Sequence, residues 1–139
     1  MQKIGLDLDN TIIIYDNLFK KIAVEKNLVP KDIKPTKTNI RNYLIEKGKE
    51  GEFTILQSIV YGKRILEAEL ARGILNFLKE KNKNFEIFII SHKTKQPIKG
   101  EKYDLHEAAK SFLREKNIIG LENYQVKEEN VYFENTIID

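Results

Sequence analysis

The sequence predicts an α/β fold with a parallel sheet, and three observations support this prediction. Apolar runs at residues 3–8, 85–90 and 131–133 have the length and composition of strands. Segments with apolar residues at helical spacing separate these runs. Strands that alternate with helices favour parallel pairing through right-handed crossovers. With 139 residues, 41% of them hydrophobic, the chain can form one globular core with a small insertion.

Helical spacing predicts four helices between the first two strands, from Asp16 or Asn17 to about Asn27, and at about 40–48, 51–61 and 66–81. The fourth has the most regular apolar stripe, formed by Leu70, Ile74, Leu75 and Leu78. The helices up to residue 61 exceed what one crossover requires, so we expect them to form a small subdomain above the strand ends. A helix at 105–116 precedes the third strand, and Asn135 or Thr136 is a candidate cap for one more.

Two aspartates stand out at the end of the first predicted strand. Asp7 and Asp9 alternate with Leu6 and Leu8, so both carboxylates are expected on one face near the strand's end. Two carboxylates held so near each other repel, and this repulsion is unfavourable unless a cation or a proton lies between them. Ligands of open α/β sheets bind at the carboxyl ends of strands, so this stretch has the character of a site. A calcium-binding loop is excluded, because Ile12 stands where such a loop needs glycine.

Composition excludes several classes of protein. Cysteine is absent, which excludes disulfide scaffolds and thiolate metal sites. The 24 Lys and Arg against 21 Asp and Glu give a formal net charge of +3, spread along the chain, so a nucleic-acid partner is not expected. No apolar stretch approaches the roughly 20 residues that span a bilayer, and the sequence opens on a strand rather than a signal peptide. We therefore expect a cytoplasmic protein without membrane contact.

The motif Asp7-Leu8-Asp9-Asn10-Thr11 after a first strand, with Ser91 at the end of the second, resembles the haloacid dehalogenase (HAD) superfamily, whose members are mostly phosphatases. The first motif matches the family's DxDxT pattern, and Ser91 matches its single Ser/Thr motif. The resemblance implies a Rossmann-like parallel sheet of the HAD type, formed by residues 1–14 and 65–139. It also implies a small α-helical cap at residues 15–64, inserted directly after the first motif.

The resemblance further implies a Mg²⁺-dependent phosphomonoester hydrolase. Asp7 is then the nucleophile that forms an aspartyl-phosphate, and Asp9 is the acid and base. The cofactor Mg²⁺ is bound by the Asp7 carboxylate, the backbone carbonyl of Asp9 and the phosphate. The hydroxyls of Thr11 and Ser91 bind phosphate oxygens. The second aspartate favours phosphoryl transfer over carbon–halogen cleavage, which needs no leaving-group acid. The expected substrate is a small phosphorylated metabolite.

Two further motifs of the family have no clear counterpart in this sequence. They are a lysine near a helix start and a late acidic pair that completes the Mg²⁺ shell. Lys110 and Lys127 are the fallback candidates for the lysine, and Asp139 is offered for the late carboxylate. We expect the α/β core to be incomplete at its C-terminal end, either as the amino-terminal part of a longer protein or as a gene product cut short. The alternative function is a phosphate- or metal-binding regulatory module that has lost catalysis.

Several other residues are candidate substrate contacts, each with a plainer alternative. Asn10 belongs to the first motif, and His92 and Lys93 follow Ser91. Ser91 has the alternative of an ordinary strand-end hydroxyl, and His92 that of an exposed loop residue. His106 is expected on a helix face without a role. Three cations of the expected cap can contact an anionic substrate, although the lysine content of the chain favours solvated surface for them: Arg41, Lys63 and Arg64.

Overall fold

A computed structural model describes residues 1–120, 122 and 124–134 of the chain. Its strands are β1 (Gln2–Leu6), β2 (Ile13–Ile14), β3 (Glu69–Leu70), β4 (Phe85–His92) and β5 (Val131–Glu134). Its α-helices are α1 (Asp16–Glu25), α2 (Lys37–Glu46), α3 (Glu50–Ser58), α4 (Ile74–Lys81) and α5 (Leu105–Glu115). A π-helical turn (Ile59–Lys63) continues α3, and short 3₁₀ turns are formed by Ile65–Glu67 and Glu128–Asn130.

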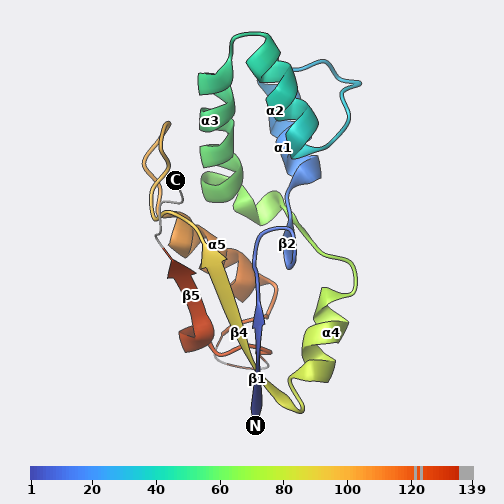
Figure 1. The fold of residues 1–139 in the computed structure, drawn as a ribbon, viewed down its shortest axis with the longest axis vertical. Helices are drawn as coiled ribbons and strands as arrows, with labels where there is room; N and C mark the ends of the chain where they lie inside the picture. The colour runs from blue at the N-terminus through green and yellow to red at the C-terminus, as the bar shows by residue number, and fades with distance from the viewer. Residues whose placement is uncertain (121, 123, 135–139) are drawn as a thin grey trace.

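Three strands form a parallel sheet in the order β1-β4-β5 (Figure 1). Gln2 of β1 pairs with Phe85 of β4, and Ile89 of β4 pairs with Val131 of β5. Helices occupy both crossovers, α1 to α4 in the first and α5 in the second. The α/β class and the three parallel strands are therefore confirmed. The carboxyl ends of all three strands point toward α1, α2 and α3 (Figure 1).

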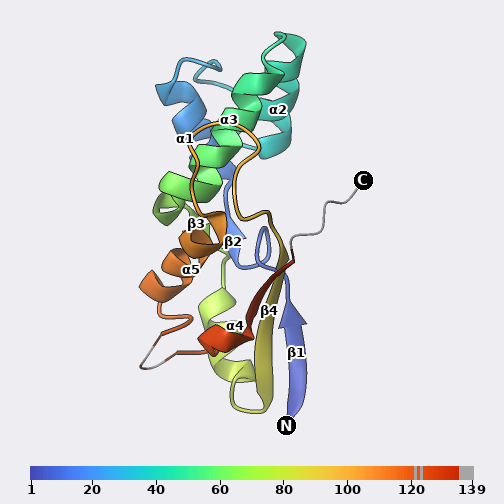
Figure 2. The same ribbon diagram turned by 90° about the vertical axis from the view of Figure 1, so that its left-hand side faces the viewer.

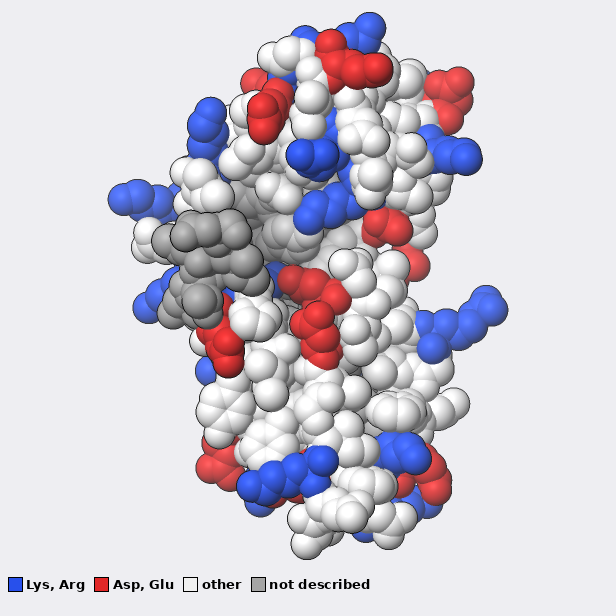
Figure 3. Space-filling model, in the orientation of Figure 1, with Lys and Arg blue, Asp and Glu red and all other residues white. Residues whose placement is uncertain are grey.

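Among the described residues, helices cover only one face of this sheet (Figure 2). Ile87 and Ile89 of β4 are buried, whereas Ile90, which points to the other face, is exposed. Tyr132 lies opposite Ile90 in the register of β5 and is exposed as well. Figure 2 shows α4 and α5 on one side of β1 and β4, and Figure 3 shows a largely uncharged surface over the other side. The alternation of buried and exposed residues along β4 follows from this one-sided cover.

Helices α1, α2 and α3 pack together beyond the carboxyl ends of the strands (Figure 1). Helix α1 buries Leu18, Phe19 and Ile22, which lie on one face at helical spacing. Helix α2 begins after Thr36, whose hydroxyl oxygen accepts the backbone N–H of Asn39 at 3.1 Å. Buried residues of these helices and of the sheet belong to one continuous apolar cluster. That the helical segment acts as a cap stays a prediction.

The helix predicted at residues 66–81 is wrong in its first half. Only Ile74–Lys81 is α-helical, and it begins after Gly73, which has a left-handed φ of 78°. Glycine adopts this conformation without a steric penalty, so the helix does not extend backwards through it. Glu69–Leu70 instead forms β3, antiparallel to Ile13–Ile14. Leu70 fits a helical stripe in the sequence, but apolar spacing cannot reveal a partner strand that lies so far away along the chain.

Two further expectations concern the membrane and the end of the chain. In the described part of the chain, no helix is both long enough and apolar enough to cross a membrane. The strand predicted at residues 131–133 is confirmed as β5 and extends to Glu134. The predictions about Asn135, Thr136 and Asp139 lie outside the described residues.

Candidate functional site

The predicted motif after β1 forms a tight turn that leads into β2. Leu8 is fully buried, and its carbonyl oxygen accepts the backbone N–H groups of Ile12 and Ile13 at 2.9 and 3.1 Å. These hydrogen bonds fix the turn around a core residue. Asp7 and Asp9 flank this anchored leucine, at the carboxyl end of β1, where ligands of parallel sheets bind.

The Asp9 side chain is the centre of the candidate site. Its Oδ1 accepts the hydroxyl of Tyr15 at 2.5 Å, and its Oδ2 lies 3.1 Å from Nζ of Lys93. Tyr15 immediately precedes α1, and Lys93 immediately follows β4. A hydroxyl donor and an ammonium group are both suitable partners for a carboxylate. Three segments that are distant in the sequence therefore meet at this one side chain.

Lys93 is buried although it carries an ammonium group, with 5% of its side chain exposed. Its Nζ lies 4.4 Å from the ring centroid of Tyr61 and 5.6 Å from that of Tyr15. The ammonium group is paired with Asp9, and no other carboxylate of a described residue lies within 4 Å of it. Burial lowers the pKa of Lys93 below its ordinary value, against the opposing charges of Asp9 and Asp7. An ammonium group with unused N–H donors is suited to bind the oxygens of an anion.

The backbone of Lys93 is held on both sides. Its N–H donates to the carbonyl of Glu134 at 3.2 Å. Its own carbonyl oxygen lies 2.6 Å from Nε2 of His106, which must be the donor because a carbonyl only accepts. The His106 ring stacks on Phe133, with 4.4 Å between the ring centroids. His106 lies in α5 and holds the backbone of Lys93 in place; that it has no functional role stays a prediction.

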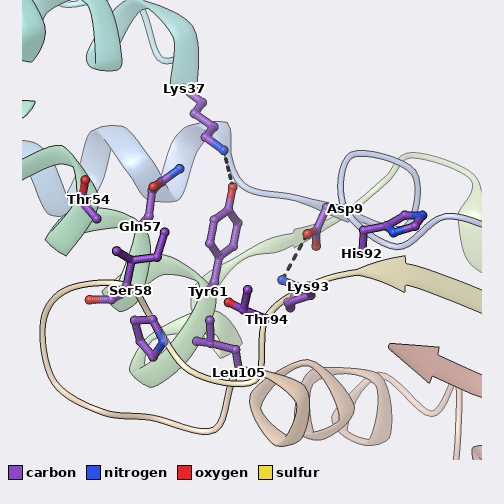
Figure 4. Close-up of a pocket in the computed structure, with 12 residues that line it drawn as sticks. Asp9, Lys37, Thr54, Gln57, Ser58, Tyr61, His92, Lys93, Thr94 and Leu105 are labelled. Atoms are coloured by element: carbon purple, nitrogen blue, oxygen red, sulfur yellow. Dashed lines mark hydrogen bonds and ion pairs between the residues drawn. The ribbon is translucent and has the colours of Figure 1, made fainter. Parts of the chain in front are cut away.

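A cavity of about 270 Å³ opens beside Asp9, between α3 and the loop that follows β4 (Figure 4). From the start of α2, Lys37 reaches into it and donates a hydrogen bond of 2.8 Å to the Tyr61 hydroxyl. The loop approaches α3 closely at Gly100, where φ is 95° and an added Cβ would lie 2.5 Å from Oγ of Ser58. The other lining residues are polar on α3 (Thr54, Gln57) and mainly apolar beyond it (Pro97, Ile98, Leu105).

Three of the predicted site residues line this cavity: Asp9, His92 and Lys93. Their roles in it differ. Asp9 and Lys93 face each other, as the dashed line in Figure 4 marks. The His92 ring is set apart from Tyr61 in the same view and is more than half exposed, with Nδ1 3.5 Å from a carboxylate oxygen of Glu134. Lys93 is therefore the better-placed contact for a ligand.

The remaining predicted residues do not line the cavity wall. Asp7 and Thr11 are exposed in the turn after β1. The charge of Asp7 nevertheless works against the lowering of the Lys93 pKa. Asn10 is exposed and adopts a left-handed φ of 67°, which asparagine tolerates better than most residues. Ser91 is buried on the helix-covered face of β4.

The ion pair between Asp9 and Lys93 was not predicted from the sequence. Lys93 is expected there only as a substrate contact, while Lys110 and Lys127 are the candidates for the family's lysine. Neither of these two lines the cavity, and Nζ of Lys127 lies 3.8 Å from a carboxylate oxygen of Glu86. The two-residue repeat of side-chain direction along a strand could have pointed to Lys93. Lys93 stands two residues beyond Ser91, so both fall on the same side of β4.

Among the cations of the helical insertion, Lys37 is the one that lines this cavity. Arg64 is instead engaged at the surface, 2.5 Å from carboxylate oxygens of both Glu25 and Glu67. Arg41 and Lys63 do not line the cavity either. No local pattern distinguishes Lys37 from these residues in the sequence, because only the packing of α2 beside Tyr61 brings it to the cavity.

The turn that contains Asp7 and Asp9 has oxygen ligands suitable for a magnesium ion whose other ligands come from water and substrate. The described residues contain no group of three or more His, Cys, Asp or Glu side chains that could hold a metal by themselves. The exposed Asp7 carboxylate accepts a hydrogen bond of 2.8 Å from the N–H of Leu8, and a carboxylate has further lone pairs for a cation. Proteins commonly hold Mg²⁺ by one or two carboxylates, completed by waters and phosphate oxygens. The residues of this turn therefore fit the ion.

The hydroxyl of Tyr15 provides a test of the Asp9 contact through the pH dependence of stability. Burial, followed by the charge and hydrogen bond of Asp9, raises the pKa of Tyr15 above its ordinary value. The folded chain therefore keeps this proton where the unfolded chain loses it, so the stabilisation is complete below about pH 10 and declines above it. We expect Tyr15→Phe to lower the free energy of unfolding by about 1 kcal/mol at neutral pH, and the deficit to shrink above about pH 10. Urea unfolding of both proteins across this range measures the difference, and a deficit that stays constant contradicts the contact.

The site thus combines two aspartates at a strand end with a buried ammonium group paired to one of them and a cavity lined by a second lysine. Such an arrangement can bind an anion next to carboxylates that exchange protons or attack an electrophilic centre. No protein-family model matches this chain, and neither does any curated protein or solved structure.

Proposed function

We propose that this protein is a Mg²⁺-dependent phosphomonoester hydrolase of the HAD type, which acts through an aspartyl-phosphate on a small phosphorylated substrate. The observation that carries the proposal is the ion pair of Asp9, two residues along the chain from Asp7, with buried Lys93 in the wall of a cavity. Anion-binding donors and two carboxylates at the end of a parallel strand are what phosphoryl transfer requires. The resemblance of the first motif to the family pattern points to the same chemistry.

In the first step, a carboxylate oxygen of Asp7 attacks phosphorus. A bond forms between this oxygen and phosphorus, and the bond from phosphorus to the leaving oxygen breaks. Asp9 gives its proton to the leaving oxygen, which departs as an alcohol. The product is an aspartyl-phosphate on Asp7.

In the second step, Asp9 accepts a proton from water, whose oxygen attacks phosphorus. The bond between phosphorus and Asp7 breaks, inorganic phosphate leaves and the Asp7 carboxylate is restored. The hydroxyl of Tyr15 and the ammonium group of Lys93 orient the Asp9 carboxylate for both proton transfers. Lys93 also supplies N–H donors to the phosphate oxygens, with the exposed Thr11 as a further hydroxyl donor, whereas the buried Ser91 is left without this predicted role.

Asp7 and the backbone carbonyl of Asp9 would hold Mg²⁺ together with the substrate. The ion, when bound, would reduce the electrostatic repulsion between the phosphate and the attacking carboxylate. The exposure of Asp7 leaves room for the waters that Mg²⁺ retains.

A screen of phosphomonoesters with Mg²⁺, and again with a chelator, tests the proposal. We expect release of inorganic phosphate that depends on Mg²⁺ and saturates with substrate. Saturable binding of phosphate without turnover of any ester would instead favour a regulatory module that binds phosphate. That alternative agrees with the absence of a third carboxylate near Asp7 and Asp9 among the described residues.

A further inference from the structure

Lys37 has features that the stability of its own helix does not explain. It is the first residue of α2, where the positive end of the helix dipole disfavours a cation. Its side chain is half-buried, and no carboxylate of a described residue lies within 4 Å of its Nζ. Burial lowers the pKa of Lys37; the charges of Asp9 and Asp16 oppose this effect, and those of Lys93 and Arg41 add to it. Because its position is unfavourable for a charged side chain in the absence of a ligand, Lys37 is better explained by ligand binding than by a contribution to stability.

The position of Lys37 in the cavity is also well defined. The carboxylate of Asp16 accepts the backbone N–H of Lys37 at 3.1 Å, which ties the start of α2 to α1. Nζ donates to the hydroxyl of Tyr61 at 2.8 Å and lies 5.6 Å from the ring centroid of Phe19. One N–H of the ammonium group is used by Tyr61, so two remain for a ligand.

Tyr61 separates Lys37 from the other ammonium group of the cavity. Nζ of Lys93 lies 4.4 Å from the Tyr61 ring centroid, and Nζ of Lys37 lies 5.2 Å from the same centroid, at the hydroxyl end (Figure 4). The two cations are therefore separated by no more than the sum of these distances. Only Lys93 is beside the Asp9 carboxylate. The cavity thus has one cation at the proposed reaction centre and a second cation close enough for one small molecule to contact both.

We propose that the substrate carries a second anionic group, a carboxylate or another phosphoryl group, which Lys37 binds while the reacting phosphate lies against Lys93. The inference rests on the proposed function and names the substrate class of that same site. Thr54 and Gln57 of α3 line the cavity and supply polar contacts along the molecule. The ring of Tyr61 would contact the central part of the substrate. A phosphomonoester without a second anionic group would leave the half-buried charge of Lys37 without an anionic partner.

Aryl phosphates that differ only at the para position test the inference. We compare kcat/KM for 4-carboxyphenyl phosphate, 1,4-phenylene bisphosphate and the uncharged isostere 4-carbamoylphenyl phosphate. We expect the charged probes to be favoured by about tenfold or more, since a charged hydrogen-bond pair contributes this much. In Lys37→Met, kcat/KM for the carboxyphenyl phosphate should fall close to that for the carbamoylphenyl phosphate. Lys37→Arg should keep most of the wild-type preference for the charged probe. Lys34→Met, an exposed lysine of the preceding loop, is the matched control and should keep the wild-type ratio.

Dissociation constants of the corresponding benzylphosphonates, which cannot be hydrolysed, provide a readout besides activity. Hydrolysis of all probes at similar rates would overturn the inference and leave the proposed hydrolase intact. Tighter binding of the carboxy phosphonate that depends on Lys37, without hydrolysis of any probe, would support the anion site and overturn the hydrolase. Neither binding nor hydrolysis would overturn both. The preference of the wild-type protein decides the question even if Lys37→Met fails to fold.

Discussion

Asp7→Asn is expected to reduce the release of inorganic phosphate by at least about a thousandfold, because an amide has no anionic oxygen to attack phosphorus. The fold should persist. Asp7 is exposed, and its Oδ1 accepts the N–H of Leu8, a hydrogen bond that an amide oxygen also forms. Steady-state kcat in the presence of Mg²⁺ measures the loss, and circular dichroism with thermal unfolding checks that the variant is folded.

The covalent step can be tested at the same residue. After rapid acid quenching of wild-type turnover, the peptide that contains Asp7 should gain the mass of one phosphoryl group. The same peptide of Asp7→Asn should not. Asp32→Asn is the matched control, since Asp32 is exposed in the loop between α1 and α2, and it should keep wild-type turnover. Full turnover by Asp7→Asn would rule out the proposed mechanism.

Lys93→Met is expected to separate activity from stability. Loss of a preorganised cation beside the phosphate should lower kcat/KM by about a hundredfold to a thousandfold. Stability should rise at neutral pH, because burial already disfavours the ammonium group and Met fills the same buried site without a charge. A gain of roughly 2–5 °C in Tm is the expected size. Asp9 keeps its hydrogen bond from Tyr15 and is one quarter exposed, so its charge is not stranded.

The comparison with other lysines decides whether Lys93 acts in the site. Lys110→Met and Lys127→Met alter residues that do not line the cavity, and they should keep activity within about twofold of wild type. A loss of activity in Lys93→Met that accompanies a fall in Tm would show that Lys93 supports the fold instead. An effect of Lys110→Met as large as that of Lys93→Met would place the functional lysine on α5.

Local sequence patterns predicted most of the elements. Alternation and apolar runs located β1, β4 and β5, and helical spacing located α1, α2, α3 and α5, because these signals depend on neighbours within a few residues. Where the signal was ambiguous, the prediction was wrong. Leu70 fits a helix by spacing, yet its pairing with Ile13 makes it a strand residue. That partner is remote in sequence, so the local pattern could not reveal it.

The candidate site divides in the same way. The sequence pattern predicted that Asp7, Asp9 and Thr11 follow β1 and that Ser91 lies near the end of β4, and hence that these groups lie at the carboxyl end of a parallel sheet. It did not predict which cations meet them, because that depends on tertiary packing. Lys93 reaches Asp9 because β4 pairs beside β1, and Lys37 reaches the cavity because α2 packs next to Tyr61. Contacts of this kind depend on how whole elements pack against one another, and in a chain with 24 Lys and Arg no spacing rule singles out the two that are drawn in.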